Sequence, residues 1–223
     1  MHFQVAFDLE LSHGRCVGVR LPEALAGDAE ETARARLDPA EWGFAQTLAP
    51  PRRHTWVGGR VALREALSRL EISCGPIFAT PRGAPALPRG VAASISHKER
   101  LAVALVARDE EGARGVDVEL AVARRKGIAR LVLTDAEQAD LGALPGAERD
   151  RELLVRFSAK EAIYKAIDPF LMRYVGFKEV SLAPLVGGDA RVVASFTPAL
   201  HIEATWQMFG DDVILTTARA RLL

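Results

Sequence analysis

Two pairs of strand-like segments, each pair separated by a short turn, constrain the fold of this chain more than any other feature. The pairs are Ala92–Ser96 with Leu101–Ala107, and Ile202–Met208 with Val213–Ala218. Short apolar runs bounded by turn residues predict β-hairpins. A stretch with helical spacing of apolar residues precedes each hairpin, at 53–71 and at 148–168. Because such elements bury their apolar faces against one another, the order predicts an α+β (α/β) fold with helices packed on mainly antiparallel sheets.

The order of helix and hairpin occurs twice along the chain. This predicts two similar subdomains, 1–110 and 111–223, related by pseudo-twofold symmetry. Binding sites often form between two such halves, so we expect the active site at the interface of the subdomains.

Local signals place the remaining elements. Further strands are expected at 3–9, 15–21, 115–120, 180–182 and 191–196. Residues 28–48 predict two short helices, the second with Asp38 as N-cap and Pro39 at its first position. Pro50-Pro51 is expected to break the chain, and the Gly- and Pro-rich residues 75–90 to form a loop.

Composition excludes several classes of protein. Lys+Arg and Asp+Glu balance at 29 each in 223 residues, so no general attraction to nucleic acid or to an anionic membrane is expected. Cys16 and Cys74 stand far apart and outside any zinc-type spacing, which favours a reducing cytoplasm. The N-terminus lacks the features of a signal peptide, and the longest apolar run, Leu101 to Ala107, is too short to span a bilayer.

Lysine is scarce in this chain, and two of its five lysines lie in the segment Phe157–Lys165. The segment has good helix formers, with Ser158 expected to cap its N-terminus. Glu161 and Lys165 then lie one turn apart on a shared face. They could form a solvated surface ion pair, or hold a metal ion and a phosphate together as part of an active site.

A second group of polar residues lies on the predicted strand Gly115–Leu120. Strict alternation puts Asp117 and Glu119 on one face of this strand. Two carboxylates so placed are either solvated on an outer face or bridged by a cation, for which their oxygen atoms favour Mg²⁺. A third group, Ser96-His97, ends the preceding hairpin strand, where it could donate to phosphate oxygens.

Together these segments resemble the 4′-phosphopantetheinyl transferase superfamily, in its larger, monomeric type associated with surfactin and enterobactin synthetases. Residues 157–165 fit the pattern (F/W)-(S/C/T)-x-K-E-(A/S)-x-x-K throughout. Arg114-Gly115-Val116-Asp117 departs from (V/I)-G-(V/I)-D only at its first position. The resemblance runs from about residue 50 to 182, and the segments outside it carry no matching motif.

The resemblance implies a role for each matching residue. Asp117, Glu119 and Glu161 match carboxylates that bind Mg²⁺, with Mn²⁺ as a possible substitute. Glu161 is the implied general base and Lys165 the implied phosphate contact, with Lys160 in support. The implied contacts to coenzyme A are Arg52 or Arg53, Arg60, Arg82, Ser96, His97, Lys160 and Lys165. Arg82 stands where many members have lysine in Gly-Lys-Pro, and the changed motif leaves its role open.

The activity implied is Mg²⁺-dependent transfer of 4′-phosphopantetheine from coenzyme A to a serine of an acyl, peptidyl or aryl carrier protein, releasing adenosine 3′,5′-bisphosphate. We assign it to the holo-acyl-carrier-protein synthase type, acting in siderophore, polyketide or nonribosomal peptide pathways as a cytoplasmic monomer. One alternative is a non-catalytic module that binds coenzyme A or a carrier protein; it would not need three carboxylates and Lys165. Another Mg²⁺-dependent nucleotidyl or phosphoryl transferase would usually carry a Gly-rich phosphate loop, and no GxxxxGK[ST] occurs in the sequence.

Overall fold

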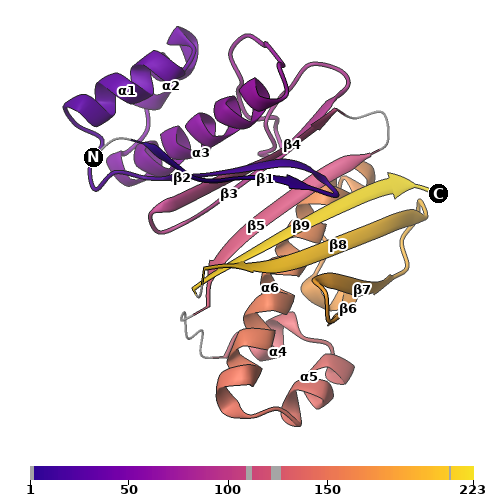
Figure 1. The fold of residues 1–223 in the computed structure, drawn as a ribbon. Coiled ribbons are helices and arrows are strands. Elements are labelled where there is room, and N and C mark those ends of the chain that lie inside the picture. The colour runs from indigo at the N-terminus through magenta and orange to yellow at the C-terminus, as the bar shows by residue number, and fades with distance from the viewer. Residues whose placement is uncertain (1–2, 109–111, 122–126, 211) are drawn as a thin grey trace. The chain divides into compact units, whose positions relative to one another are not determined.

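The computed structural model describes residues 3–108, 112–121, 127–210 and 212–223. The chain divides into two compact units, Met1–Glu110 and Glu111–Leu223. Each unit contains one antiparallel sheet with helices, so the mixed α+β fold predicted from the sequence is confirmed (Figure 1). The pseudo-twofold relation and a site between the units stay predictions. Within the described residues, no helix has the length and apolar character needed to cross a membrane.

The first unit contains a four-stranded sheet with the strand order β1-β2-β4-β3. Its elements are β1 (Gln4–Leu11), β2 (Gly14–Arg20), α1 (Asp28–Arg36), α2 (Pro39–Gln46), α3 (Pro50–Arg69), β3 (Val91–Lys98) and β4 (Leu101–Arg108). Helix α3 packs on β2 and β4 and buries Val61, Leu63 and Leu67 against Val17 and Ala104. This apolar layer is the core of the unit.

The helix boundaries in the first unit follow from capping chemistry. Asp38 caps α2 in a capping box with Glu41, as expected, and Pro39 opens the helix. The expectation that Pro50-Pro51 breaks the chain was wrong, because these prolines form the first turn of α3. A proline at the start of a helix loses no intrahelical hydrogen bond, since the first N–H groups have no partner there.

The β3–β4 hairpin is longer than predicted. Its pairing runs from Val91 opposite Arg108 to Lys98 opposite Leu101. His97 and Lys98 therefore belong to the strand, and only Glu99 and Arg100 form the turn, with Glu99 in the left-handed region at φ 47°.

The second unit contains a five-stranded sheet with the order β5-β9-β8-β7-β6. Its elements are β5 (Ala113–Leu120), α4 (Ala129–Val132), α5 (Asp135–Gly142), α6 (Gly146–Leu171), the 3₁₀ helix Phe177–Glu179, β6 (Val180–Pro184), β7 (Asp189–Ala194), β8 (Leu200–Phe209) and β9 (Val213–Leu222). Helix α6 packs on β5 and β9, as α3 packs on β2 and β4. The sequence also predicts helical stretches at roughly 126–132 and 135–141; α4 and α5 lie there, and position 126 lies outside the described residues.

Gly115 sets how closely α6 approaches β5. A Cβ atom added at Gly115 would lie 1.8 Å from the carbonyl oxygen of Ala162, which is part of the helix backbone. Only a residue without a side chain allows this contact, so Gly115 permits the close approach of the two backbones.

We predict that Gly115→Ala lowers the free energy of unfolding by about 1–3 kcal/mol, because the backbone of α6 or β5 has to move. Urea unfolding followed by circular dichroism measures the change. Gly142→Ala is the matched control in the same unit, since a Cβ atom there meets nothing within 4 Å. An unchanged stability for Gly115→Ala would contradict the close packing.

Candidate active site

The segment Phe157–Lys165 lies in the interior of α6. The helix begins at Gly146, so the expectation that Ser158 caps a helix N-terminus was wrong. Ser158 is fully buried, and its hydroxyl donates to Oδ2 of Asp117 at 2.9 Å. The hydroxyl oxygen of Thr216 lies 2.9 Å from the same Ser158 oxygen. Since the Ser158 proton is used on the carboxylate, Thr216 donates to Ser158, and a chain of hydroxyls leads to Asp117.

Asp117 and Glu119 lie on the face of β5 that is covered by α6. Their exposed fractions are 6% and 4%, which excludes the solvated outer face considered from the sequence alone. Oδ1 of Asp117 accepts a hydrogen bond from Nζ of Lys165 at 3.0 Å. The same ammonium also donates to the Val116 carbonyl at 2.8 Å. The Asp117 carboxylate is therefore compensated by a charged and a neutral donor from α6.

Glu161, Tyr164 and Lys165 are the partly accessible residues of the segment. Glu161 is half-buried, and the Lys165 side chain is 28% exposed. Both hydrogen bonds of the Lys165 ammonium go to β5, so Lys165 is held by the strand and not by a solvated ion pair with Glu161. Lys165 is thus a partly exposed cation whose ammonium is held in place by two hydrogen bonds, which suits a phosphate contact.

The three predicted metal ligands supply oxygen atoms, the donors that Mg²⁺ prefers. Within the described parts of the chain, however, no three His, Cys, Asp or Glu side chains are grouped closely enough to hold a metal ion. The chemistry of Asp117, Glu119 and Glu161 fits a hard cation, while their assembly into one ligand set stays a proposal.

Lys160 points into the second unit. Its side chain is 1% exposed, and its Nζ donates to Oε2 of Glu137 at 2.7 Å and to the Val132 carbonyl at 2.8 Å. Burial lowers the pKa of Lys160, and the hydrogen bond to Glu137 acts in the opposite direction. This position favours a structural role over a direct ligand contact.

The predicted contacts of the first unit occupy different environments. Arg60 is buried, donates from Nε to the Ile77 carbonyl at 2.9 Å, and lies 4.8 Å from the centre of the Trp56 ring. Burial lowers the pKa of Arg60 to about 10. Arg53 donates to the carbonyls of Gln46, the last residue of α2, and of Leu48 just after it, each at 3.2 Å.

The other predicted contacts of the first unit are more open. Arg52 and Arg82 are exposed, at the start of α3 and in the loop before β3. Ser96 is buried and His97 exposed. These neighbours on β3 therefore point to opposite faces, and a joint contact of both with a phosphate stays a proposal.

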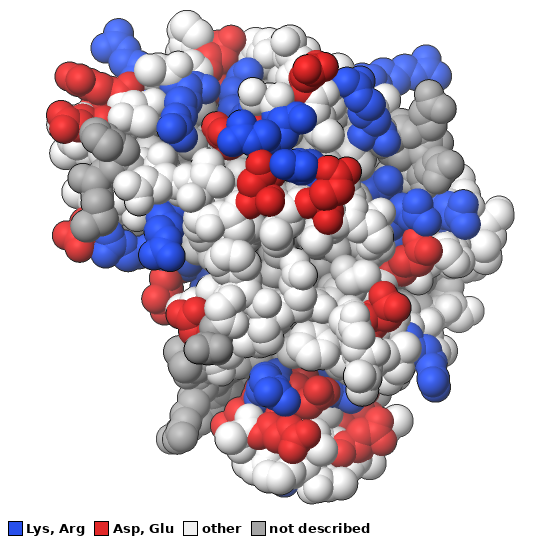
Figure 2. All heavy atoms as spheres, viewed as in Figure 1, with Lys and Arg blue, Asp and Glu red and all other residues white. Residues whose placement is uncertain are grey.

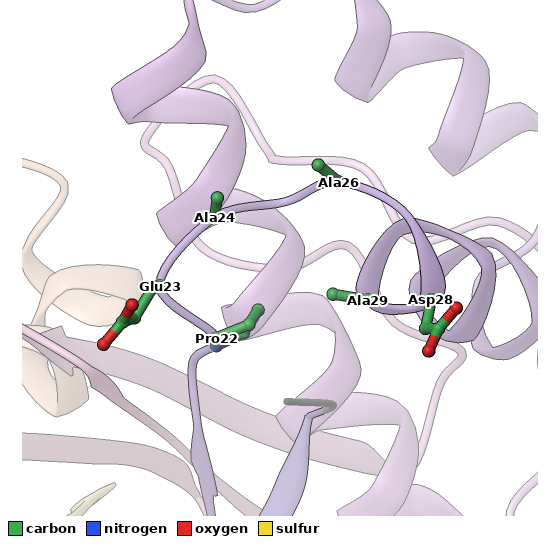
Figure 3. Close-up of a pocket in the computed structure, with 6 residues that line it drawn as sticks. All are labelled: Pro22, Glu23, Ala24, Ala26, Asp28 and Ala29. Carbon is green, nitrogen blue, oxygen red and sulfur yellow. The ribbon is translucent and has the colours of Figure 1, made fainter.

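A pocket of about 330 Å³ lies in the first unit around the start of α1. It is lined by Pro22, Glu23, Ala24, Ala26, Asp28 and Ala29 (Figure 3). Its charged side chains are both carboxylates, so it does not suit a phosphate-rich ligand, and none of the predicted site residues lines it. Figure 2 shows positive and negative side chains interspersed on the visible face, in keeping with the balanced composition.

Sequence reasoning missed two polar residues around α6, Thr216 and Glu137, and gave a third, Ser158, the wrong role. Thr216 carries no local signal, because only the register of β9 with β5 places it opposite Asp117. Ser158 was noticed but given the wrong role. Glu137 was detectable, since Thr134 and Glu137 form a capping box at the start of α5.

Comparison with known proteins gives two family matches that together span most of the chain. Residues 40–107 match the 4′-phosphopantetheinyl transferase N-terminal domain, and residues 113–218 match the 4′-phosphopantetheinyl transferase superfamily. The 4′-phosphopantetheinyl transferase Npt of Nocardia iowensis is 33% identical over 198 residues, which cover 81% of this chain and 88% of Npt.

Two further relatives are also named as 4′-phosphopantetheinyl transferases. The transferase Svp of Streptomyces mobaraensis is 34% identical over 161 residues, covering 70% of this chain and 64% of Svp. The transferase PptT of Mycobacterium tuberculosis is 32% identical over 146 residues, covering 65% of this chain and 63% of PptT. The match thus spans slightly less than two thirds of Svp and of PptT.

We predict that Ser158→Ala lowers the free energy of unfolding by about 1–3 kcal/mol, because a buried carboxylate loses a donor. The matched control is Thr205→Val, in the sheet of the same unit. It removes one hydroxyl of a neutral pair, because the hydroxyl oxygens of Thr205 and Thr217 lie 2.8 Å apart. The control should lose about 0.5–1.5 kcal/mol in the same urea titration. If Ser158→Ala lowers the free energy of unfolding no more than this control does, the hydrogen bond to Asp117 contributes no more to stability than a neutral hydrogen bond.

Proposed function

The chain belongs to the 4′-phosphopantetheinyl transferase superfamily, and we propose that it transfers the 4′-phosphopantetheine group of coenzyme A to a serine of an acyl, peptidyl or aryl carrier protein. The observation that carries the proposal is the contact of Lys165 with Asp117, beside the half-buried Glu161. The relatives are named as 4′-phosphopantetheinyl transferases. Activity of the holo-acyl-carrier-protein synthase type, on a fatty-acid carrier, is a narrower proposal within this class.

In the proposed reaction, the serine oxygen of the carrier protein forms a bond to the β-phosphorus of coenzyme A. The bond from this phosphorus to the bridging oxygen of the pyrophosphate breaks, and adenosine 3′,5′-bisphosphate leaves with that oxygen. Glu161 accepts the proton of the attacking hydroxyl as general base. Lys165 is held in place by Asp117 and the Val116 carbonyl, and its charge compensates negative charge on the pyrophosphate.

Asp117, Glu119 and Glu161 would hold Mg²⁺, or Mn²⁺ in its place. The bound cation supplies positive charge to the pyrophosphate oxygens. Arg60, with Arg52 or Arg53, is the proposed contact of the first unit for the remaining phosphate, the 3′-phosphate. Arg82, Ser96 and His97 are further proposed contacts with coenzyme A.

The contact between Asp117 and Lys165 favours an enzyme over a binding module. A module that only binds coenzyme A or a carrier protein would not need a buried Asp117 bonded to Lys165, which favours the enzyme.

The two cysteines are free thiols, consistent with the reducing cytoplasm that we propose. A monomeric state, without nucleic-acid or membrane partners, completes the proposal.

We expect Glu161→Gln to abolish transfer while leaving the fold intact, because an amide cannot accept the serine proton. The assay incubates an apo carrier protein with enzyme, coenzyme A and Mg²⁺, and follows the gain of one phosphopantetheine by intact-mass spectrometry. Near-normal turnover of a folded Glu161→Gln protein would remove Glu161 from the mechanism.

A second test removes the metal. Transfer should stop on addition of a chelator and return when Mg²⁺ is restored in excess, because the cation is proposed to compensate the pyrophosphate charge. The same mass assay gives the readout, with enzyme and carrier protein kept folded throughout. Full activity in metal-free buffer would refute the carboxylate assignment without refuting the transfer itself.

A further inference from the structure

A buried carboxylate links three elements of the second unit to α6. Glu137 is 2% exposed, and its Oε2 accepts from the Thr134 amide and from Lys160 Nζ, each at 2.7 Å. Its Oε1 accepts from the Leu182 amide of β6 at 2.9 Å. Lys160 adds a bond to the Val132 carbonyl at the end of α4. One ion pair thus holds α4, α5 and β6 to α6.

The first unit contains the same device. Glu41 is fully buried, and its Oε2 accepts from the Asp38 amide and from Arg64 Nε, each at 2.9 Å. Its Oε1 accepts from the Ile77 amide at 2.9 Å. In both units the glutamate closes a capping box, and its cation follows 23 residues later in the long helix.

This correspondence aligns the two long helices. If Arg64 corresponds to Lys160, then Glu65 corresponds to Glu161 and Arg69 to Lys165. In the first unit Arg69 pairs with Glu65 and with Asp8 of β1, each at 2.8 Å. In the second unit Lys165 donates to Asp117. Both units therefore have an anchoring cation at this place in the long helix, and in both the cation five residues later bonds to an aspartate of a strand.

We infer that Lys160 and Glu137 form a positioning pair for the catalytic segment of α6, and that Lys160 does not contact coenzyme A. Side chains of consecutive helical residues point about 100° apart. Fixing Lys160 toward α5 and β6 therefore fixes the rotation of α6 and the direction of Glu161. Phe157, on the same side, packs against Phe177 with ring centres 5.7 Å apart and adds an apolar contact to the same anchor.

The inference rests on the proposed function for what is positioned, but the pair itself can be tested without turnover. The five lysines are acetylated in the native protein, with and without coenzyme A, and each is quantified by peptide mass spectrometry. Lys160 should stay unmodified in both states, while the exposed Lys178 reacts and Lys165 reacts and is protected by coenzyme A. Acetylation in urea should modify Lys160 fully, which controls for intrinsic reactivity.

A Lys160 that reacts in the free protein and is protected by coenzyme A would overturn the inference. A wild-type protein that fails to transfer phosphopantetheine, yet shows the expected acetylation pattern, would refute the proposed function and leave the buried pair intact.

A double-mutant cycle tests the positioning role. Glu137→Gln and Lys160→Met should each lower kcat by about tenfold or more, because each leaves one polar partner buried and unpaired. The KM for coenzyme A should stay within about twofold, and the double variant should lose no more than the worse single variant. Arg64→Met, which removes the matching cation of the first unit, should leave kcat unchanged in a folded protein.

An increase in KM for coenzyme A with Lys160→Met alone, or additive losses in the double variant, would show a ligand contact instead. Melting temperatures measured for all variants confirm that kcat is compared between folded proteins. If the single variants do not fold, the acetylation experiment on the wild-type protein still decides between the two roles.

Discussion

The second unit depends on the close approach of α6 to β5 at Gly115. A glycine there lets the backbone of the helix lie directly on the strand. Ser158 and Lys165, on either side of this contact along α6, can then both reach Asp117. A side chain at position 115 would separate the two elements, and the hydrogen bonds to Asp117 would lengthen with them. The glycine of the strand motif and the serine and lysine of the helix motif therefore belong to one packing arrangement.

Two buried charges at the contacts of α6, Asp117 and Lys160, are compensated within the second unit. Asp117 accepts from Lys165 and Ser158, and Lys160 bonds to Glu137. Moving a charge out of water is costly unless it is paired and hydrogen-bonded, so these networks tolerate few substitutions. The two pairs differ in access, because Lys160 is enclosed while Lys165 is partly exposed. This difference separates an anchoring ammonium from one that can meet a ligand.

Periodicity and capping signals predicted most of the fold. They located the strands of both sheets and the helices around Asp38 and in the motif segment, because these signals are local. Ser158 resembles a cap when its segment is taken alone, but the helical spacing from residue 148 already places it inside the helix, which begins at Gly146. The pairing of β3 with β4 also continues through His97, which sequence alone assigned to a turn. Capping residues and turn residues have other uses once an element is extended by tertiary packing.

The candidate site was predictable in part. The motif spacing selected Asp117, Glu161 and Lys165, but the direction of Lys160 depends on Glu137, which lies 23 residues earlier. Thr216 became visible only through strand register. Neither partner can be found from the local pattern of the motif, since both lie on other elements.

The most direct test of the central claim is ³¹P NMR of coenzyme A bound to the protein in the presence of Mn²⁺. If the carboxylates and Lys165 form one site for the pyrophosphate, Mn²⁺ should strongly broaden the two pyrophosphate resonances in the wild-type protein. Asp117→Asn should greatly reduce this broadening while the protein stays folded. Equal broadening in wild type and Asp117→Asn, or bound coenzyme A whose pyrophosphate signals do not respond to Mn²⁺, would contradict the account.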